Sequence, residues 1–169
     1  ASILKLEQCQ NEPTFTYSVN VDGLEKAIIK YKSSQTKIIF FSSPHVFSGQ
    51  RQYCMEDEII DPHNIYGHHK AIGEKMVLSH GGLVIRVPKI IDSQFFRFKD
   101  WVHKLKNFQK VYAYSNLRTS LITLKSLVKI MNIVVQKNWD GVIHISGPDD
   151  KSYCEIALML ARGFQYDER

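Results

Sequence analysis

Residues 37–70 read KIIFFSSPHVFSGQRQYCMEDEIIDPHNIYGHHK, and this stretch decides the fold. It opens with four consecutive apolar residues, Ile38–Phe41, which predict a buried strand that ends at Ser42 and Ser43. A polar loop follows, and a helical pattern begins near Tyr66. A strand, a serine at its end, a loop and a Tyr–Lys pair on a helix are typical of an active site.

Helices and strands alternate on both sides of this stretch. Apolar residues recur at helical spacing over Thr14–Ser33, and Leu83–Val87 reads as a second buried strand that Pro88 stops. The connections are long enough for crossovers, which indicates an α/β fold with a parallel sheet and helices on its faces.

The C-terminal part predicts further elements. The basic amphipathic pattern of Ser93–Phe108 could lie on a membrane, but we interpret it as a helix packed on the domain with a solvated charged face. Ser152 with Glu155 three residues later forms a capping box that starts the last helix. Between these come a short strand, a helix and a longer strand, at Val111–Tyr114, Thr123–Gln136 and Gly141–Ser146.

The composition indicates a globular protein with dispersed charge. The chain has 169 residues, of which 44% are hydrophobic, and a net charge of +5. No apolar run approaches the roughly 20 residues of a membrane span, and the Lys and Arg residues form no long run, so we expect neither membrane nor nucleic-acid binding. Three distant cysteines and the lack of a signal-peptide pattern predict a cytoplasmic protein, and the absence of Cys-x-x-Cys gives no support to a metal site.

Tyr66 and Lys70 are the main candidates for chemistry. Residues four apart on a helix share a face, and a nearby ammonium group favours the phenolate and lowers the pKa of the tyrosine. Such a phenol can exchange a proton with a carbonyl or an alcohol, while Ser43 could hold the same oxygen. On spacing alone, a surface pair without function remains open, because the chain has eight tyrosines.

Other polar residues have structural interpretations. We interpret Arg86 as a member of a structural hydrogen-bond network rather than a phosphate ligand, and the acidic run Glu56–Glu58 as a solvated loop. His68 and His69 lack the further ligands that a metal would need. Asn20 could either orient groups near the site or pack between helices.

Three segments resemble, in order, motifs of the extended short-chain dehydrogenase/reductase family, and most closely those of its dTDP-4-dehydrorhamnose reductase branch. They are IFFSSPHVFSG at Ile39–Gly49, YCMEDEIIDPHNIYGHHK at Tyr53–Lys70 and LVIRVP at Leu83–Pro88. Val19–Gly23 is similar to the family's helix motif N-V-x-G. The resemblance implies a partial doubly wound (Rossmann-like) parallel sheet in residues 1–92 and a small substrate-binding portion in residues 93–169.

The resemblance also assigns roles. Tyr66 would donate a proton, Lys70 would lower its pKa and bind the cofactor ribose, and Ser43 would replace the family's catalytic threonine or serine. The implied reaction is NAD(P)-dependent reduction of a 4-keto nucleotide sugar, and a homodimer is left open. Further contacts are implied with the cofactor, NADP or NAD, and with the substrate: Ser42, Val87 and Pro88 for the first, and His45, Asn64 and Lys89 for the second.

The sequence departs from the family's pattern at three places. No Gly-x-x-Gly-x-x-Gly is present, although that loop cradles the cofactor's pyrophosphate. We expect a fragment, a degenerate form or a protein whose other half is supplied separately. Pro44 and His45 replace the usual Asp and Tyr, and Lys89 replaces an aromatic residue. A second hypothesis is therefore a non-catalytic relative that binds or regulates a partner.

Overall fold

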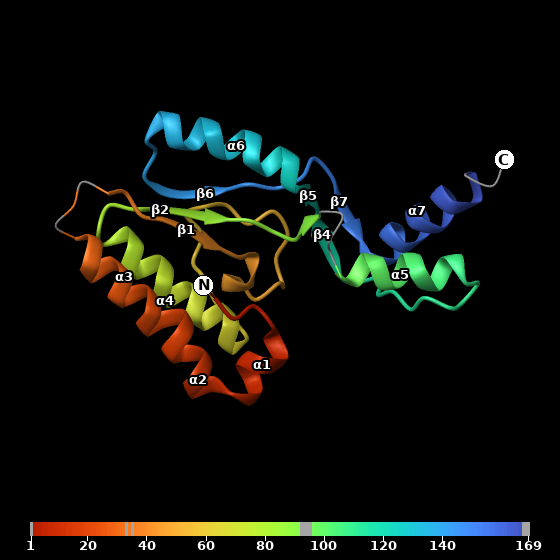
Figure 1. Cartoon of the computed structure of the whole chain (residues 1–169), viewed down its shortest axis with the longest axis horizontal. Helices are drawn as coiled ribbons and strands as arrows, with labels where there is room; N and C mark the ends of the chain where they lie inside the picture. Colours follow the sequence, from red (N-terminus) through yellow and green to blue (C-terminus); the bar gives the residue numbers. More distant parts are fainter. Residues whose placement is uncertain (1, 33, 35, 92–95, 167–169) are drawn as a thin grey trace. The chain divides into compact units, whose positions relative to one another are not determined.

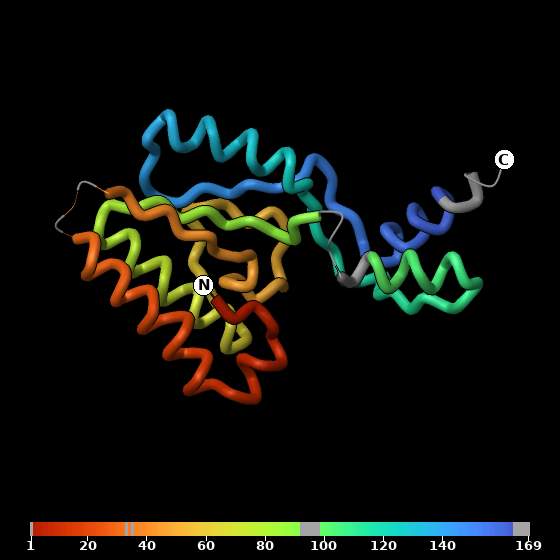
Figure 2. The backbone as a smooth tube through the Cα atoms, in the orientation of Figure 1, coloured from red at the N-terminus to blue at the C-terminus, as the bar shows by residue number. Residues whose placement is uncertain are grey.

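The structure is a computed structural model, and it describes residues 2–32, 34, 36–91 and 96–166. The chain divides into two compact units, the first comprising Ala1–Val87 with Val134–Ile145, and the second Pro88–Ile133 with Ser146–Arg169. Figure 2 follows the trace, which leaves the first unit after Val87 and returns to it at Val134. The boundary predicted between residues 92 and 93 lies outside the described residues.

A parallel sheet forms the centre of the first unit. Its strands are β1 (Ile39–Ser42), β2 (Leu83–Arg86) and β6 (Gly141–His144), in the order β1-β2-β6. Both pairs are parallel, with Ile39 opposite Leu83 and Leu83 opposite Gly141. All four residues of the central strand are buried, as expected for a run of apolar side chains covered on both faces. The predicted α/β fold with a parallel sheet is confirmed.

Two helices, α3 (Gly23–Tyr31) and α4 (Ile65–Leu78), lie side by side on one face of this sheet (Figure 1). Ile28 of α3, Val77 of α4 and Val84 of β2 form the buried cluster between them. Because α4 connects β1 to β2 and packs on both strands, its N-terminal turn lies near the carboxyl end of β1.

The N-terminal helical stretch is longer and less regular than predicted. It comprises α1 (Leu6–Asn11), α2 (Pro13–Tyr17) and a π-helical turn at Ser18–Asp22 that leads directly into α3. Asn20 of this turn is buried, and its Oδ1 accepts a hydrogen bond of 2.7 Å from the backbone N–H of Ile3. Asn20 therefore anchors the start of the chain.

The second unit is built around smaller strand pairs. β3 (Ile90–Ile91) pairs in parallel with β5 (Ile122–Thr123), and β4 (Arg118–Ser120) pairs antiparallel with β7 (Asp150–Ser152). Its helices are α5 (Phe96–Lys106), the first part of α6 (Leu124–Lys137) and α7 (Tyr153–Tyr166). Trp101, Tyr153 and Ile156 form its buried cluster. The predicted start of α5 at Ser93 lies outside the described residues.

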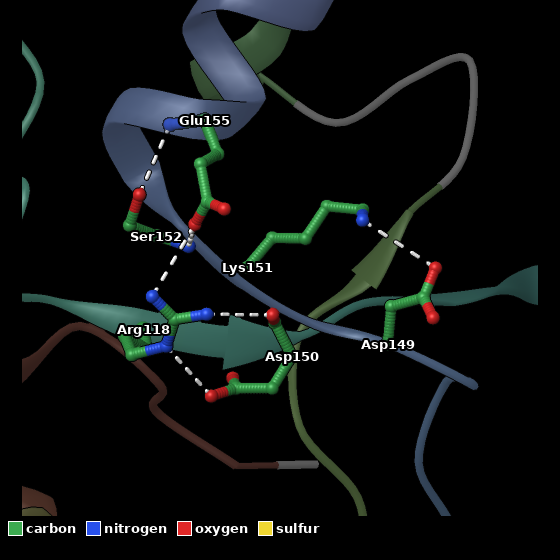
Figure 3. Close-up of polar contacts among 6 residues, drawn as sticks. All are labelled: Arg118, Asp149, Asp150, Lys151, Ser152 and Glu155. Carbon is green, nitrogen blue, oxygen red and sulfur yellow. Dashed lines mark hydrogen bonds and ion pairs between the residues drawn. The ribbon is translucent and has the colours of Figure 1, made fainter.

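The capping box at the start of α7 is confirmed (Figure 3). The N–H of Ser152 donates to Glu155 Oε2 at 2.7 Å, and the N–H of Glu155 donates to Ser152 Oγ at 3.0 Å. Arg118 of β4 joins this group, because its guanidinium contacts Asp150 Oδ2 at 2.8 Å and Glu155 Oε2 at 3.3 Å. These contacts fasten the strand pair β4–β7 to the first turn of α7.

The strand predicted at Val111–Tyr114 is wrong. This segment is irregular, although Val111 and Ala113 pack on the cluster around Trp101 while Tyr112 and Tyr114 are exposed. The alternation is that of a strand, but the carbonyl of Tyr114 accepts a hydrogen bond of 3.1 Å from the N–H of Cys154 at the start of α7. Within the described part of the chain, no helix is long and apolar enough to cross a membrane.

Candidate active site

Three polar side chains stand at the carboxyl ends of the three parallel strands. Ser42, Arg86 and His144 are the last residues of β1, β2 and β6, and they lie opposite one another in the strand register. In open α/β sheets, ligands bind outside the carboxyl ends of the strands. Ser43 follows Ser42 directly, so the predicted serine lies at this edge.

Ser43 and Tyr66 come together within the first unit. Ser43 begins a 3-10 turn at Pro44–Val46, where its Oγ accepts a hydrogen bond of 3.3 Å from the N–H of His45. Tyr66 is the second residue of α4 and is 8% exposed. Burial raises the pKa of the Tyr66 phenol, and a hydrogen bond with the Ser43 side chain opposes that rise. The two hydroxyl groups are thus placed to act on one oxygen atom.

The start of α4 is fixed by two local features. Asn64 caps the helix, because its Oδ1 accepts a 2.8 Å hydrogen bond from the N–H of Gly67. A Cβ atom at Gly67 would lie 2.1 Å from the carbonyl oxygen of His45 and 3.0 Å from the Cβ of Pro62. Only glycine therefore lets the first turn of α4 approach the turn that follows Ser43.

Lys70 lies one helical turn after Tyr66 and is buried. Its Nζ donates a 2.8 Å hydrogen bond to the carbonyl oxygen of Phe41 and lies 4.6 Å from the ring centroid of Phe40. The same nitrogen is 5.7 Å from the centroid of the Tyr66 ring. Burial lowers the pKa of Lys70 to about 8, against the opposing effect of the Glu74 carboxylate. The four-residue spacing correctly predicted that Tyr66 and Lys70 lie on the same face of the helix.

The predicted lowering of the Tyr66 pKa is wrong for this structure. Burial raises the pKa of the phenol, and the hydrogen bond with Ser43 opposes that effect only in part. The ammonium group of Lys70 is directed to the Phe41 carbonyl, and burial disfavours its own charge. Desolvation therefore has the largest effect on the pKa of the phenol.

Glu74 is a polar residue of the site that the sequence interpretation missed. It lies one turn after Lys70 on α4, is 2% exposed, and forms an ion pair with Arg86 at 2.8 Å. The hydroxyl of Ser42 donates to Glu74 Oε1. The structural interpretation of Arg86 is confirmed. The available signal for Glu74 was an acidic residue at helical spacing on the face that carries Tyr66 and Lys70.

The interpretation of the acidic run as a solvated loop is wrong at Glu56. Its Oε1 accepts a 2.9 Å hydrogen bond from the N–H of His144, and its carbonyl accepts one of 3.2 Å from Arg86 Nη1. The Arg86 guanidinium also lies 4.9 Å from the ring centroid of Phe47. Arg86 thus ties the loop after β1 to the end of the sheet.

The adjacent histidines of α4 have different surroundings. His68 is exposed, whereas His69 is buried, packs edge-on against the ring of Tyr17 at 5.5 Å and lies 3.5 Å from Asn20 Nδ2. Burial lowers the pKa of His69. Among the residues described, no three His, Cys, Asp or Glu side chains form a group that could hold a metal ion.

The remaining predicted contact residues fall into both units. His45 is exposed, with its ring 5.8 Å from that of Tyr66, and the N–H of Val87 donates to the Ser42 carbonyl at 3.5 Å. Pro88 and Lys89 belong to the second unit, where the Lys89 ammonium donates to the hydroxyl of Tyr153. The substrate and cofactor roles of these residues stay predictions.

A pocket of about 440 Å³ lies within the second unit. Three of its nine lining residues carry polar side chains, Thr119, Asp149 and Lys151, and the last two form an ion pair of 3.4 Å (Figure 3). The other lining residues are Ile91, Leu121, Pro148, Ile156, Met159 and Leu160.

Comparison with known proteins gives a match over the whole chain. The model of the family described as the RmlD substrate binding domain matches residues 1–169. Methionine adenosyltransferase 2 subunit beta of Pongo abelii is 33% identical over 170 residues, which cover 92% of this chain and 50% of that protein. The chain therefore spans about half the length of this curated relative.

Solved structures share the fold. A hypothetical dTDP-4-dehydrorhamnose reductase from Sulfolobus tokodaii has a TM-score of 0.89 and 26% identity, and the match covers 97% of this chain and 59% of that one. The dTDP-4-dehydrorhamnose reductase of Bacillus anthracis, solved in complex with NADP, has a TM-score of 0.90 and 23% identity, with 99% and 60% covered. These matches confirm the predicted Rossmann-like fold.

Proposed function

The chain belongs to the RmlD substrate binding domain family, and we propose that the whole protein reduces a 4-keto nucleotide sugar with NADPH or NADH. The observation that carries the proposal is the contact of Tyr66 with Ser43 at the carboxyl end of β1, with Lys70 buried one turn further along α4. The proposal concerns the whole protein because the chain spans about half the length of its relatives.

The geometry suits proton donation to a substrate carbonyl. The phenol of Tyr66 carries the proton that a donor needs at neutral pH, and its hydrogen bond with Ser43 opposes the rise in pKa that burial causes. The Ser43 hydroxyl holds the same carbonyl oxygen and orients it towards the phenol. A bound nicotinamide supplies the hydride.

The side chains at the sheet edge fit the nicotinamide end of such a cofactor. An ammonium group has three N–H donors, and Lys70 gives one of them to the Phe41 carbonyl, so we assign the others to the ribose hydroxyls. Ser42, Val87 and Pro88 would lie beside the nicotinamide. The sequence has no Gly-x-x-Gly-x-x-Gly to hold the pyrophosphate, so that group needs residues from elsewhere in the whole protein.

Titration of the whole protein with NADPH and NADH, followed by fluorescence, tests the proposal. We expect binding of one cofactor, and Tyr66→Phe should abolish turnover of a 4-keto nucleotide sugar while most of the cofactor affinity remains. Tyr112→Phe is the matched control, because Tyr112 is exposed and lies in the second unit. Full activity of Tyr66→Phe would rule out Tyr66 as the proton donor. Sedimentation of the same sample shows whether the protein is a monomer or a homodimer.

A second candidate is a protein that binds a partner without catalysis. One observation favours it: the 33% identical relative is named as a subunit of another enzyme. Pro44 and His45, which replace the family's usual Asp and Tyr beside Ser43, also favour this second candidate. Under this alternative the whole protein binds neither NADPH nor NADH, and Tyr66→Phe leaves assembly with the partner unchanged.

A further inference from the structure

Three ionisable side chains follow one another along the buried face of α4. Tyr66, Lys70 and Glu74 are spaced four residues apart, so they share one side of the helix. They are 8%, 6% and 2% exposed. The proposed reaction uses the first two and gives no role to the third, although Glu74 is the most deeply buried.

The carboxylate of Glu74 is held by the ends of two strands. Its Oε1 accepts from the Ser42 hydroxyl and, at 3.0 Å, from Arg86 Nε. Its Oε2 accepts from Arg86 Nη2 at 2.8 Å. A buried carboxylate with this many charge-assisted hydrogen bonds is fixed in position.

We propose that Glu74 is a positioning residue of the candidate active site, whose carboxylate fixes α4 against the ends of β1 and β2 and supplies the negative charge beside Lys70. The first part follows from the contacts. Ser42, which donates to Glu74, directly precedes Ser43, so one carboxylate joins the helix of the proton donor to the strand that carries its hydroxyl partner. The claim that Glu74 supports catalysis in this way rests on the proposed function.

The second part concerns the charge of Lys70. Burial lowers the pKa of Lys70 to about 8, and the Glu74 carboxylate works against that shift. The other titratable or charged groups nearby are Tyr66 on α4, Arg86 on β2, which is bound to Glu74, and His144 on β6, 3.1 Å from Arg86. Without Glu74, a lysine buried here would lose its proton at lower pH.

The test is the pKa of Lys70, measured by NMR of ¹³C-labelled lysine side chains in the 169-residue chain. Lys70→Met identifies the resonance. In Glu74→Gln, loss of the negative charge should move the Lys70 midpoint to lower pH than in the wild type. If Glu74 only fills space, the glutamine, which has nearly the same shape, fills it equally well, and the Lys70 midpoint stays unchanged. A rise, or no change, would overturn the proposal.

Controls keep this result interpretable. Glu25→Gln removes an exposed carboxylate from α3 and should leave the Lys70 midpoint unchanged. Should Glu74→Gln fail to fold, the double variant Glu74→Gln with Arg86→Met removes both members of the ion pair, so the Arg86 guanidinium is not left buried without its carboxylate. The midpoint of Lys70 should be lowered in this variant too.

The Lys70 titration distinguishes a failure of the role proposed for Glu74 from a failure of the proposed function. The Lys70 titration needs no cofactor or substrate, so a whole protein that binds no NADPH would refute the proposed function alone. If the whole protein is active, Glu74→Gln should move the alkaline limb of its pH–rate profile to lower pH, because the limb follows loss of the Lys70 charge. If activity falls while the alkaline limb stays at the same pH, Glu74 has only a structural role, and the proposed positioning role is overturned.

Discussion

Burial changes the pKa of Lys70, a residue whose position on the helix follows from the sequence. Helical spacing puts it on the face of Tyr66, but its burial in the folded chain decides its ionisation. Its pKa falls to about 8 from the usual 10.5 because the buried position disfavours the charge. The folded state therefore binds this proton more weakly than the unfolded state does.

This difference predicts a pH-dependent stability. Where the unfolded state binds more protons, the free energy of unfolding rises with pH, and for Lys70 this window begins near pH 8. Between about pH 7.5 and about pH 9.5, the free energy of unfolding of the wild type should rise by about 2 kcal/mol relative to Lys70→Met. Urea denaturation at both pH values measures this, and a constant difference between the two proteins would contradict it.

The position of helix α4 depends on one close contact with a neighbouring turn. Gly67 brings its first turn against the 3-10 turn at Pro44–Val46, and Asn64 caps the same turn. The Y-G-x-x-K pattern therefore contains a packing requirement as well as a chemical pair. If α4 moved outward, Tyr66 would move away from Ser43.

Gly67→Ala should destabilise the first unit by about 1 to 3 kcal/mol, the usual cost of inserting a methyl group into a packed site. The reason is the backbone carbonyl of His45, which cannot move as a side chain could. Gly23→Ala is the matched control: a Cβ atom there would lie 3.8 Å from the carbonyl oxygen of Ser18, so helix propensity should stabilise the protein by about 0.5 to 1 kcal/mol. Thermal denaturation of the two variants checks this, and equal melting temperatures would refute it.

Arg86 of the central strand connects several elements of the first unit. Its guanidinium contacts Glu74 of α4, His144 of β6 and the loop carbonyl of Glu56. The partners of this side chain come from sequence positions up to 58 residues away. One buried cation therefore holds together the helix, the neighbouring strand and the loop of the candidate site.

Arg86→Met should cost about 3 to 5 kcal/mol of stability, because it leaves the Glu74 carboxylate buried without its partner. Adding Glu74→Gln to this variant should recover part of the loss, since the Glu74 carboxylate is then no longer buried without the Arg86 guanidinium. Urea unfolding of the single variants and the double variant measures the coupling. Strictly additive losses would show that the pair contributes nothing as a pair.

Several features of this protein follow from local sequence alone. Consecutive apolar residues form β1 and β2, and helical periodicity places Tyr66 and Lys70 on one face, because both patterns are read within a few residues. The capping box of Ser152 and Glu155 is local in the same sense. These features suffice to indicate the α/β fold and the candidate pair.

Only the tertiary structure decided the rest, because it depends on contacts between distant residues and on burial. The Ser42–Glu74 bond joins residues 32 apart, and the bond between Glu56 and His144 joins residues 88 apart. The alternation at Val111–Tyr114 resembles a strand, yet that segment packs against α7. The pKa of Tyr66 is raised and not lowered, because desolvation depends on how the whole chain covers the phenol. The sequence determined which residues could meet, and the folded chain decided which charges and hydrogen bonds they carry.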